Sequence, residues 1–298
     1  MAKPSLTYVL ISPARNEEAF LETTIRSVVS QTVLPLRWVI VSDGSNDQTE
    51  VIATWYCERY PWMTLVTRPP RDVRDFAGKV AAFNAGLDTI KHVNFDIVGS
   101  LDADLSFVPD YFEFLLGKFA ADPQLGVAGC PFSEEGVTYD YTFSSVEHVS
   151  GACQLFRREC YQQIGGYVPL KGGGIDVVAV LTARMKGWRT RTFPERVCVH
   201  HRPMGSANDT TKFRANYKLG QRAYRLGFHP VWQLCRSAYQ MTRRPYVSGG
   251  VALAAGYFGA MLSGSERAVS QEVAAFQGRD QMRRLRTFVG ARLGIKPQ

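Results

Sequence analysis

The sequence predicts an α/β protein with a mixed, mostly parallel sheet flanked by helices, followed by a basic helical extension. Two observations predict this class. Short apolar runs rich in β-branched residues alternate with segments of helical spacing over residues 1–205. Polar clusters follow several of these runs, and in such sheets ligands bind beyond the carboxyl ends of the strands. We therefore expect a functional site at that edge of the sheet.

The first part of the chain alternates strand and helix. Residues 6–13 form a run with β-branched and aromatic side chains, and residues 17–30 carry apolar side chains at helical spacing. The next predicted elements are a strand at 38–42, a helix that begins at Asn46 or Asp47 and runs to about Tyr60, and a strand at 63–67. This alternation is typical of parallel strands joined by crossover helices.

A pair of aspartates follows the fourth predicted strand. The apolar run 95–98 ends at Gly99 and Ser100, and Asp102 and Asp104 come next. Because side chains alternate in an extended segment, we expect both carboxylates to point at one place. Two close carboxylates repel each other unless a cation lies between them, and hard oxygen ligands suit Mg²⁺ or Mn²⁺. A solvated loop with two incidental acids is the alternative.

Lys79 lies near the start of a helix that Gly78 opens, after a charged loop at 68–79. Helix N-termini and an ammonium group both favour anions, so Lys79 is well placed for a phosphate. A solvated surface lysine is the alternative.

The following segment continues the α/β pattern and adds two candidate groups. The predicted elements are a helix at 109–121, strands at 126–130 and 150–156, a helix at 157–164, a helix opened by Asp176, and strands at 187–194 and 197–202. Asp176 follows a glycine-rich loop, and a plain helix cap is its alternative role. His200 and His201 are adjacent on a strand and point to opposite faces, so at most one joins a metal site.

The charge is divided unevenly along the chain. The net charge is +8, but from His201 to the end 16 basic residues face 4 acidic ones, which gives +12 there and −4 before it. Residues 214, 218, 222 and 225 place basic side chains on one helical face. A basic extension indicates an anionic partner such as a membrane surface, a nucleic acid or a phosphorylated substrate.

Residues 247–265 carry no charge and contain five glycines. Their helical part, from Val251, is shorter than the roughly 20 residues that a bilayer span needs. We expect an interfacial or re-entrant helix, or a buried hairpin, and the flanking arginines suit an anionic lipid surface. The first residues lack a long apolar run and the six cysteines form no Cys-x-x-Cys pair, so we expect no signal peptide, reduced thiols and a cytoplasmic location.

With these residues assembled, the chain resembles glycosyltransferase family 2, the inverting nucleotide-sugar enzymes with the GT-A fold. The resemblance covers residues 5–205. The matching pieces are Pro13-Ala-Arg-Asn-Glu17, Val41-Ser-Asp-Gly-Ser45 with Asp47-Gln-Thr49, Gly78-Lys-Val-Ala-Ala-Phe-Asn-Ala-Gly86, Leu101-Asp-Ala-Asp104, the glycine pattern from Gly151 to Tyr167, and the segment from Gly174 to Trp188. Each piece is weak alone, but their order and spacing are specific.

The resemblance implies roles for individual residues. Those implied to hold the nucleotide sugar are Pro13, Ala14, Arg15, Glu17, Asp43, Lys79, Asp102 and Ala103, with Asp43 facing the base. Those implied to bind Mn²⁺ or Mg²⁺ are Asp104 and Asp102 with His200, or His201 in its place. Asp176 takes the position of the catalytic base, and the residues expected on the acceptor side are Gly151, Gly174 and His201. Many members have Glu-Asp where this chain has Ile175 and Asp176, which affects fine positioning of the acceptor and not the reaction class.

The implied reaction is a single displacement. Asp176 would take the proton of an acceptor hydroxyl as it attacks the sugar, and the metal would neutralise the departing nucleoside diphosphate. We expect a UDP-sugar donor, with a GDP-sugar as the alternative, and a glycan or lipid-linked acceptor. Residues 1–105 would bind the donor, and residues 106–205 would form the acceptor side. We expect residues 206–298 to dock on the inner face of the cell membrane; a helical cap that completes the acceptor pocket or forms a dimer is the alternative.

Two other functions remain as alternatives. A sugar nucleotidyltransferase would need a glycine-rich basic first loop, whereas residues 13–17 contain no glycine and are acidic. A catalytically inactive binding module would use the basic extension. Nucleic acid is not expected as a partner, because the basic helix lacks interleaved aromatic residues for stacking.

Overall fold

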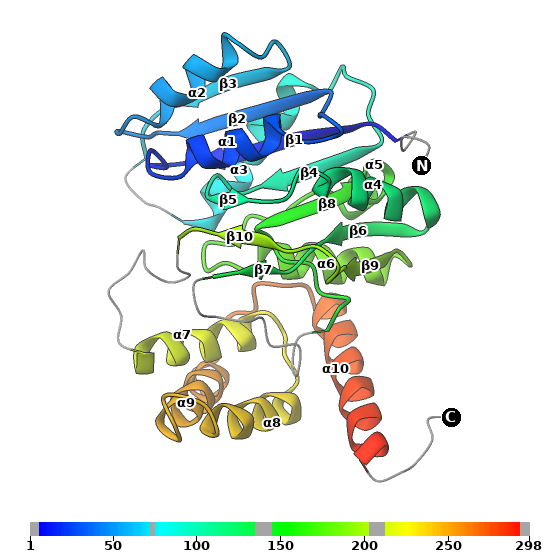
Figure 1. Cartoon of the computed structure of the whole chain (residues 1–298). Helices are drawn as coiled ribbons and strands as arrows, with labels where there is room; N and C mark the ends of the chain where they lie inside the picture. The colour runs from blue at the N-terminus through cyan, green and yellow to red at the C-terminus, as the bar shows by residue number, and fades with distance from the viewer. Residues whose placement is uncertain (1–5, 72–74, 135–144, 203–211, 293–298) are drawn as a thin grey trace. The chain divides into compact units, whose positions relative to one another are not determined.

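A computed structural model describes residues 6–71, 75–134, 145–202 and 212–292. The chain divides into two compact units, Met1–Met204 and Gly205–Gln298 (Figure 1). The first unit holds all the strands of the described residues, and the second is helical.

The first unit is built on a seven-stranded sheet with the order β3-β2-β1-β4-β8-β6-β9. Its strands are β1 (Tyr8–Ala14), β2 (Arg37–Asp43), β3 (Met63–Arg68), β4 (Ile97–Leu101), β6 (Leu125–Gly129), β8 (Cys153–Arg157) and β9 (Arg189–Thr192). Strands β3, β2, β1 and β4 run parallel, while β8 pairs antiparallel with both β4 and β6. The predicted mixed, mostly parallel sheet is therefore confirmed.

Helices pack on both faces of the sheet because the side chains of each strand alternate. The helices of this unit are α1 (Leu21–Val29), α2 (Thr49–Cys57), α3 (Phe76–Thr89), α4 (Tyr111–Ala121), α5 (Arg158–Ile164) and α6 (Ile175–Met185). Leu10 and Ile40 lie in the buried cluster with residues of α1, α2 and α4. On the other face, Gly86 of α3 lies against Ile11 and Val41, where an added Cβ would come within 2.8 Å of each.

Several helix starts differ by one to four residues from the prediction, with α1 beginning at Leu21 and not at residue 17, and a side-chain cap explains one of them. Helix α3 begins at Phe76 because Asp75 Oδ1 accepts a hydrogen bond from the Gly78 N–H at 2.9 Å. Helix α2 begins at Thr49, with Gln48 at the N-cap position. Asp47 Oδ1 accepts a hydrogen bond from the Thr49 N–H at 3.0 Å, so the predicted acidic residue binds a free backbone N–H at the start of this helix.

A small second sheet lies at the edge of the first and positions a histidine. It contains β5 (Leu105–Ser106), β7 (Phe132–Ser133) and β10 (Cys198–His200) in the order β5-β10-β7. Strand β10 runs antiparallel to β5, and its register places His200 opposite Leu105. This pairing brings a residue from the end of the unit beside the aspartates that follow β4.

The second unit consists of α7 (Lys212–Arg225), α8 (Pro230–Met241), α9 (Ser248–Leu262) and α10 (Gln271–Arg292). Helix α9 packs closely on α7 through glycines, since a Cβ on Gly220 would lie 2.1 Å from the Leu253 carbonyl oxygen. A Cβ on Gly256 would likewise lie 2.0 Å from the Tyr217 carbonyl oxygen. The uncharged stretch is thus one continuous helix and not a hairpin. Among the helices of the described residues, none is long and apolar enough to cross a membrane.

Candidate active site

The two aspartates of the Asp-x-Asp pair lie in a turn between β4 and β5. The expected alternation along an extended strand is therefore wrong, because β4 ends at Leu101 and the chain turns before β5. The carboxylates nevertheless converge: ligand atoms of Asp102, Asp104 and His200 all lie within 4.8 Å of one another. The turn, and not the pleat of a strand, brings the acids together.

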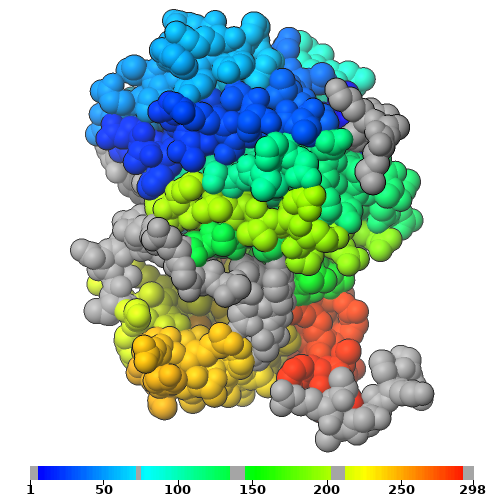
Figure 2. Space-filling model, in the orientation of Figure 1, coloured from blue at the N-terminus to red at the C-terminus, as the bar shows by residue number. Residues whose placement is uncertain are grey.

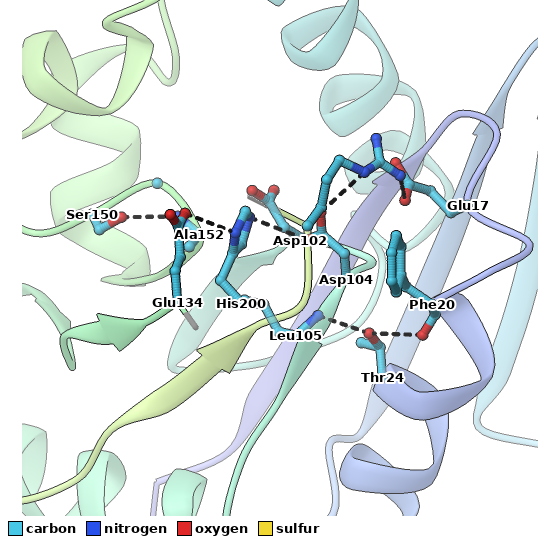
Figure 3. A network of polar contacts seen from close by, with 12 residues as sticks. Glu17, Phe20, Thr24, Asp102, Asp104, Leu105, Glu134, Ser150, Ala152 and His200 are labelled. Carbon is cyan, nitrogen blue, oxygen red and sulfur yellow. Dashed lines mark hydrogen bonds and ion pairs between the residues drawn. The ribbon is translucent and has the colours of Figure 1, made fainter. Parts of the chain in front are cut away.

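The two adjacent histidines have different partners: His200 is the last residue of β10 and lies beside Asp104 (Figure 3), and His201 follows the strand. His200 Nε2 lies 3.5 Å from Asp104 Oδ1, and its Nδ1 lies 3.2 Å from Glu134 Oε1. His201 Nε2 lies 2.8 Å from Ser106 Oγ, and its ring stacks on Phe20 with centroids 6.3 Å apart. The structure thus brings His200, and not His201, beside the two aspartates.

The residues of this cluster fit a divalent cation. Asp104 is buried, and its Oδ1 has no hydrogen-bond partner within the described segments. A buried carboxylate oxygen without a partner is costly unless something else satisfies it. Two carboxylates and an imidazole are donors that suit Mn²⁺, and carboxylates alone also suit Mg²⁺.

Lys79 connects this cluster to the start of α3. Its ammonium forms an ion pair with Asp102 Oδ1 and lies 3.3 Å from the Gly151 carbonyl oxygen. Burial, partly opposed by Lys79 and reinforced by Asp104, raises the pKa of the Asp102 carboxyl. Burial alone would lower the pKa of Lys79, but the carboxylates of Asp102, Asp176 and Asp104 together raise it. Lys79 is therefore held as a cation beside the candidate metal ligands.

Asp176 lies in the first turn of α6, after Gly174, which adopts a left-handed conformation at φ +92°. Its Oδ2 accepts a hydrogen bond from the Gly151 N–H at 3.2 Å. The hydrogen bond reaches outside the helix, so this contact is not that of a helix cap. The carbonyl oxygen of Gly151 also accepts a hydrogen bond from the Lys79 ammonium, so Gly151 contacts both the lysine and the Asp176 carboxylate.

The residues expected around the nucleoside follow β1 and β2. Asp43 ends β2, is buried, and accepts hydrogen bonds from Arg68 at 2.5 Å and from Arg71. Arg15 donates to the Arg71 carbonyl oxygen at 2.6 Å. Pro13 and Ala14 are the last residues of β1, so this group lies at the carboxyl edge of the sheet.

Glu17 joins the same edge to the cluster of carboxylates. It is buried and forms an ion pair with Arg202, whose Nε lies 3.8 Å from Asp104 Oδ2. The buried Ala103 lies between the two aspartates of the turn. Figure 3 shows Glu17 and Asp104 near each other although they lie far apart in the sequence.

Sequence reasoning missed three residues of this site: Glu134, Arg202 and Arg71. Arg71 lies in a charged loop that the sequence made conspicuous, and Arg202 directly follows the two histidines. Glu134 follows the short strand β7, and the residues around it form no motif that predicts a functional role. All three are recognised only from contacts between distant segments.

The sheet and its edge define a class of protein. The α/β fold presents, beyond the carboxyl ends of its strands, a candidate divalent-cation site, a half-buried lysine suited to phosphate, and a further carboxylate, Asp176. This combination fits the binding of a divalent cation together with a phosphorylated ligand.

Comparison with known proteins identifies the family. The chain matches Glycosyl transferase family 2 over residues 9–171. It is 32% identical over 136 residues to the uncharacterized glycosyltransferase YibD of Escherichia coli, covering 44% of this chain and 36% of that protein. It is 30% identical over 203 residues to the poly-beta-1,6-N-acetyl-D-glucosamine synthase of Staphylococcus aureus, covering 61% of this chain and 47% of that protein. The chain thus spans less than half the length of these two relatives.

Solved structures share the fold. One is the mannosyltransferase PcManGT of Pyrobaculum calidifontis in complex with GDP-Man and Mn²⁺, with a TM-score of 0.57 and 20% sequence identity. The superposition covers 96% of this chain and 82% of the PcManGT chain. Another is TarS of S. aureus in complex with UDP-GlcNAc, with a TM-score of 0.54 and 12% sequence identity. The superposition covers 91% of this chain and 78% of the TarS chain. These likenesses confirm the predicted GT-A class.

The match covers more than half of the sequence, so the chain belongs to glycosyl transferase family 2. The predicted family is confirmed.

Proposed function

We propose that the protein is an inverting, metal-dependent hexosyltransferase in which Asp176 is the catalytic base. The observation that supports this proposal is the hydrogen bond between Asp176 and Gly151. Because Gly151 also contacts Lys79, the Asp176 carboxylate lies near the lysine that pairs with Asp102. Asp176 accepts the proton of the acceptor hydroxyl as the oxygen attacks the anomeric carbon. A single base without a covalent intermediate gives inversion.

The other residues bind and orient the donor. Lys79 holds the diphosphate, and Asp43 faces the base of the nucleotide. Asp102, Asp104 and His200 would hold Mn²⁺ or Mg²⁺, which supplies Lewis-acid stabilisation of the leaving diphosphate. The geometry that supports these roles is the convergence of the three ligands and the ion pair between Lys79 and Asp102.

The proposed donor is a UDP-sugar, with a GDP-sugar as the alternative. Structural neighbours hold UDP-GlcNAc and GDP-Man, and a relative is named for making a polymer of N-acetylglucosamine. The proposed acceptor is a glycan or a lipid-linked glycan. The enzyme would meet it as a peripheral protein on the cytoplasmic face of the membrane.

Thermal shift with UDP and GDP, each with and without Mn²⁺, tests the donor site. A ligand that binds only the folded state raises the melting temperature by mass action. We expect metal-dependent stabilisation by UDP. The absence of a shift with either nucleotide and metal would contradict the proposed donor site and favour a binding module.

The variant Asp176→Asn tests the base. It should retain the nucleotide-dependent shift of the melting temperature and lose sugar transfer, because the amide cannot take the proton. Turnover equal to that of the wild type would overturn the role of Asp176 while leaving the donor site in place.

A further inference from the structure

Helix α9 is apolar on its outward face as well as on its inward face. Its inward side is buried in the second unit through Leu253, Tyr257 and Ala260. On the opposite side, the exposed fractions are 60% for Val247, which precedes the helix, and 83% for Leu262 at its end. A helix on the surface of a soluble protein normally carries polar residues on this side.

The exposed apolar residues form one stripe. The residues of this outward face are Val247, Val251, Ala254, Ala255, Phe258, Met261 and Leu262. They recur at spacings of three and four, so they share one side of the helix. Figure 2 shows atoms of α9, in orange, on the visible surface of the second unit. We call this stripe the outward apolar face.

Positive charge surrounds the outward apolar face. Residues 210–265 contain eight lysines and arginines and no aspartate or glutamate. Arg243 and Arg244 are exposed directly before α9, and Arg267 is exposed shortly after it. The stripe therefore has two exposed arginines before it and the exposed pair Glu266 and Arg267 after it. Helices α7, α8 and α9 contain no acidic residue.

We propose that the outward apolar face of α9 lies on the surface of an anionic lipid bilayer, with Arg243, Arg244 and Arg267 at the level of the head groups. An apolar helical face with basic flanks is the pattern of an interfacial helix. The 15 residues of α9 form a helix of about 22 Å, shorter than the roughly 30 Å of the hydrocarbon core, so the helix lies along the surface.

Lipid fits this surface better than the other occupants. A nucleic acid would be met by stacking aromatic side chains, but most of the stripe is aliphatic. A second copy of the chain would present the same excess of positive charge, and the like charges at the two ends would repel. The inference deepens the proposed membrane location and does not depend on the catalytic role of Asp176.

Flotation of the full chain with vesicles tests the proposal. The vesicles are phosphatidylcholine alone or phosphatidylcholine with phosphatidylglycerol, at low and at high salt. We expect the wild type to float with the anionic vesicles only, and less so at high salt, because ions screen the attraction. If the wild type does not float with anionic vesicles at low salt, the proposal is overturned.

Two variants and their controls locate the surface. The double variants Val251→Ser with Leu262→Ser, and Arg243→Glu with Arg244→Glu, should each lower the partition coefficient at least about tenfold. Val51→Ser and Lys91→Glu change exposed residues of the first unit and should float like the wild type. Equal flotation of all variants would assign lipid binding to another surface and overturn the proposal.

Two further measurements separate this proposal from others. Asp176→Asn should float like the wild type, so loss of transfer in that variant with intact flotation keeps the two proposals distinct. Light scattering after size exclusion reports self-association. A wild-type dimer that Val251→Ser with Leu262→Ser converts to a monomer, with unchanged lipid binding, would show that a second copy covers the stripe.

Discussion

The backbone N–H of Gly151 donates a hydrogen bond to Asp176 Oδ2 at 3.2 Å, and the carbonyl oxygen of the same residue accepts one from Lys79 at 3.3 Å. Gly151 thus joins the proposed catalytic base to the lysine that is paired with Asp102. A shift of the chain at Gly151 would displace both groups.

The variant Gly151→Ala tests this relationship. The added Cβ would lie 3.0 Å from Cβ and 3.3 Å from Cγ of Asp176, so the Asp176 side chain has to give by a few tenths of an ångström. Because small misplacements of a catalytic group are costly, we expect kcat to fall by about 10- to 100-fold. The nucleotide-dependent thermal shift should fall less than kcat, because the nucleoside contacts lie elsewhere and only Lys79 links Gly151 to the proposed diphosphate site.

Gly172→Ala is the matched control for this substitution. A Cβ at Gly172 meets no atom within 4 Å, so transfer should proceed at the wild-type rate. A Gly151→Ala enzyme with wild-type kcat would show that Gly151 does not position the base.

A second prediction concerns Glu134, which lies 3.2 Å from His200 Nδ1 on the side of the ring away from Asp104. Carboxylates in this position orient metal-binding histidines, and their loss typically weakens metal binding 10- to 100-fold. We expect Glu134→Gln to weaken Mn²⁺ binding by about that factor. Calorimetric titration with Mn²⁺ in the absence of nucleotide measures the affinity directly.

Glu134→Asp and Glu58→Gln provide the comparison. The shorter carboxylate of the first should restore part of the affinity, and the second changes a carboxylate that is 70% exposed. Unchanged Mn²⁺ affinity in Glu134→Gln would mean that His200 needs no carboxylate partner to bind the ion.

A third prediction concerns Asp43, whose carboxylate pairs with both Arg68 and Arg71. Its side chain is 6% exposed, and the two arginine side chains are 23% and 27% exposed. Removing the carboxylate leaves two cations partly buried without their partner. We expect Asp43→Ala to lower the free energy of unfolding by about 2 kcal/mol, below the cost of breaking a fully buried pair. It should also remove the UDP-dependent thermal shift.

Urea denaturation measures the first effect and thermal shift the second. Asp88→Ala, at an exposed position of α3, should leave both values unchanged. If Asp43→Ala kept its stability and lost only nucleotide binding, the two arginines would have found other partners, and the structural part of the prediction would be wrong.

Features that depend on neighbouring residues could be predicted from the sequence, whereas contacts between distant segments could not. The elements and the strand ends follow from local patterns. The sequence also predicts that Asp102 and Asp104 converge and that only one of His200 and His201 faces them, but a turn after β4, and not strand alternation, brings the two acids together. The roles of Glu134 and Arg202 depend on the pairing of β10 with β5 and β7, which joins segments 66 to 95 residues apart. No local pattern contains that pairing.

The extension shows the same division. The lack of charge in residues 247–265 was visible in the sequence, but the use of Gly220 and Gly256 to bring α7 against α9 was not. Glycine in a helix is unfavourable by propensity alone. Only the distance between the two backbones explains why these positions carry no side chain.

The last prediction therefore concerns Gly220 in α7. An added Cβ would lie 2.1 Å from the Leu253 carbonyl oxygen and 2.8 Å from the Tyr257 nitrogen. Both atoms belong to the backbone of α9, so the helices have to separate. Overpacking of this kind costs about 1–3 kcal/mol and outweighs the gain of up to about 1 kcal/mol in helix propensity. Gly220→Ala should lower the free energy of unfolding.

Gly117→Ala in α4 should change the free energy of unfolding in the opposite direction. No atom lies within 4 Å of a Cβ at Gly117, so the propensity gain stands alone and the variant should be as stable as the wild type or more so. Urea denaturation of both variants, followed by far-UV circular dichroism, compares them. If Gly220→Ala were stabilised to the same degree as Gly117→Ala, α7 and α9 would not be in close backbone contact. The buried side of α9, and with it the assignment of its outward apolar face, would then be wrong.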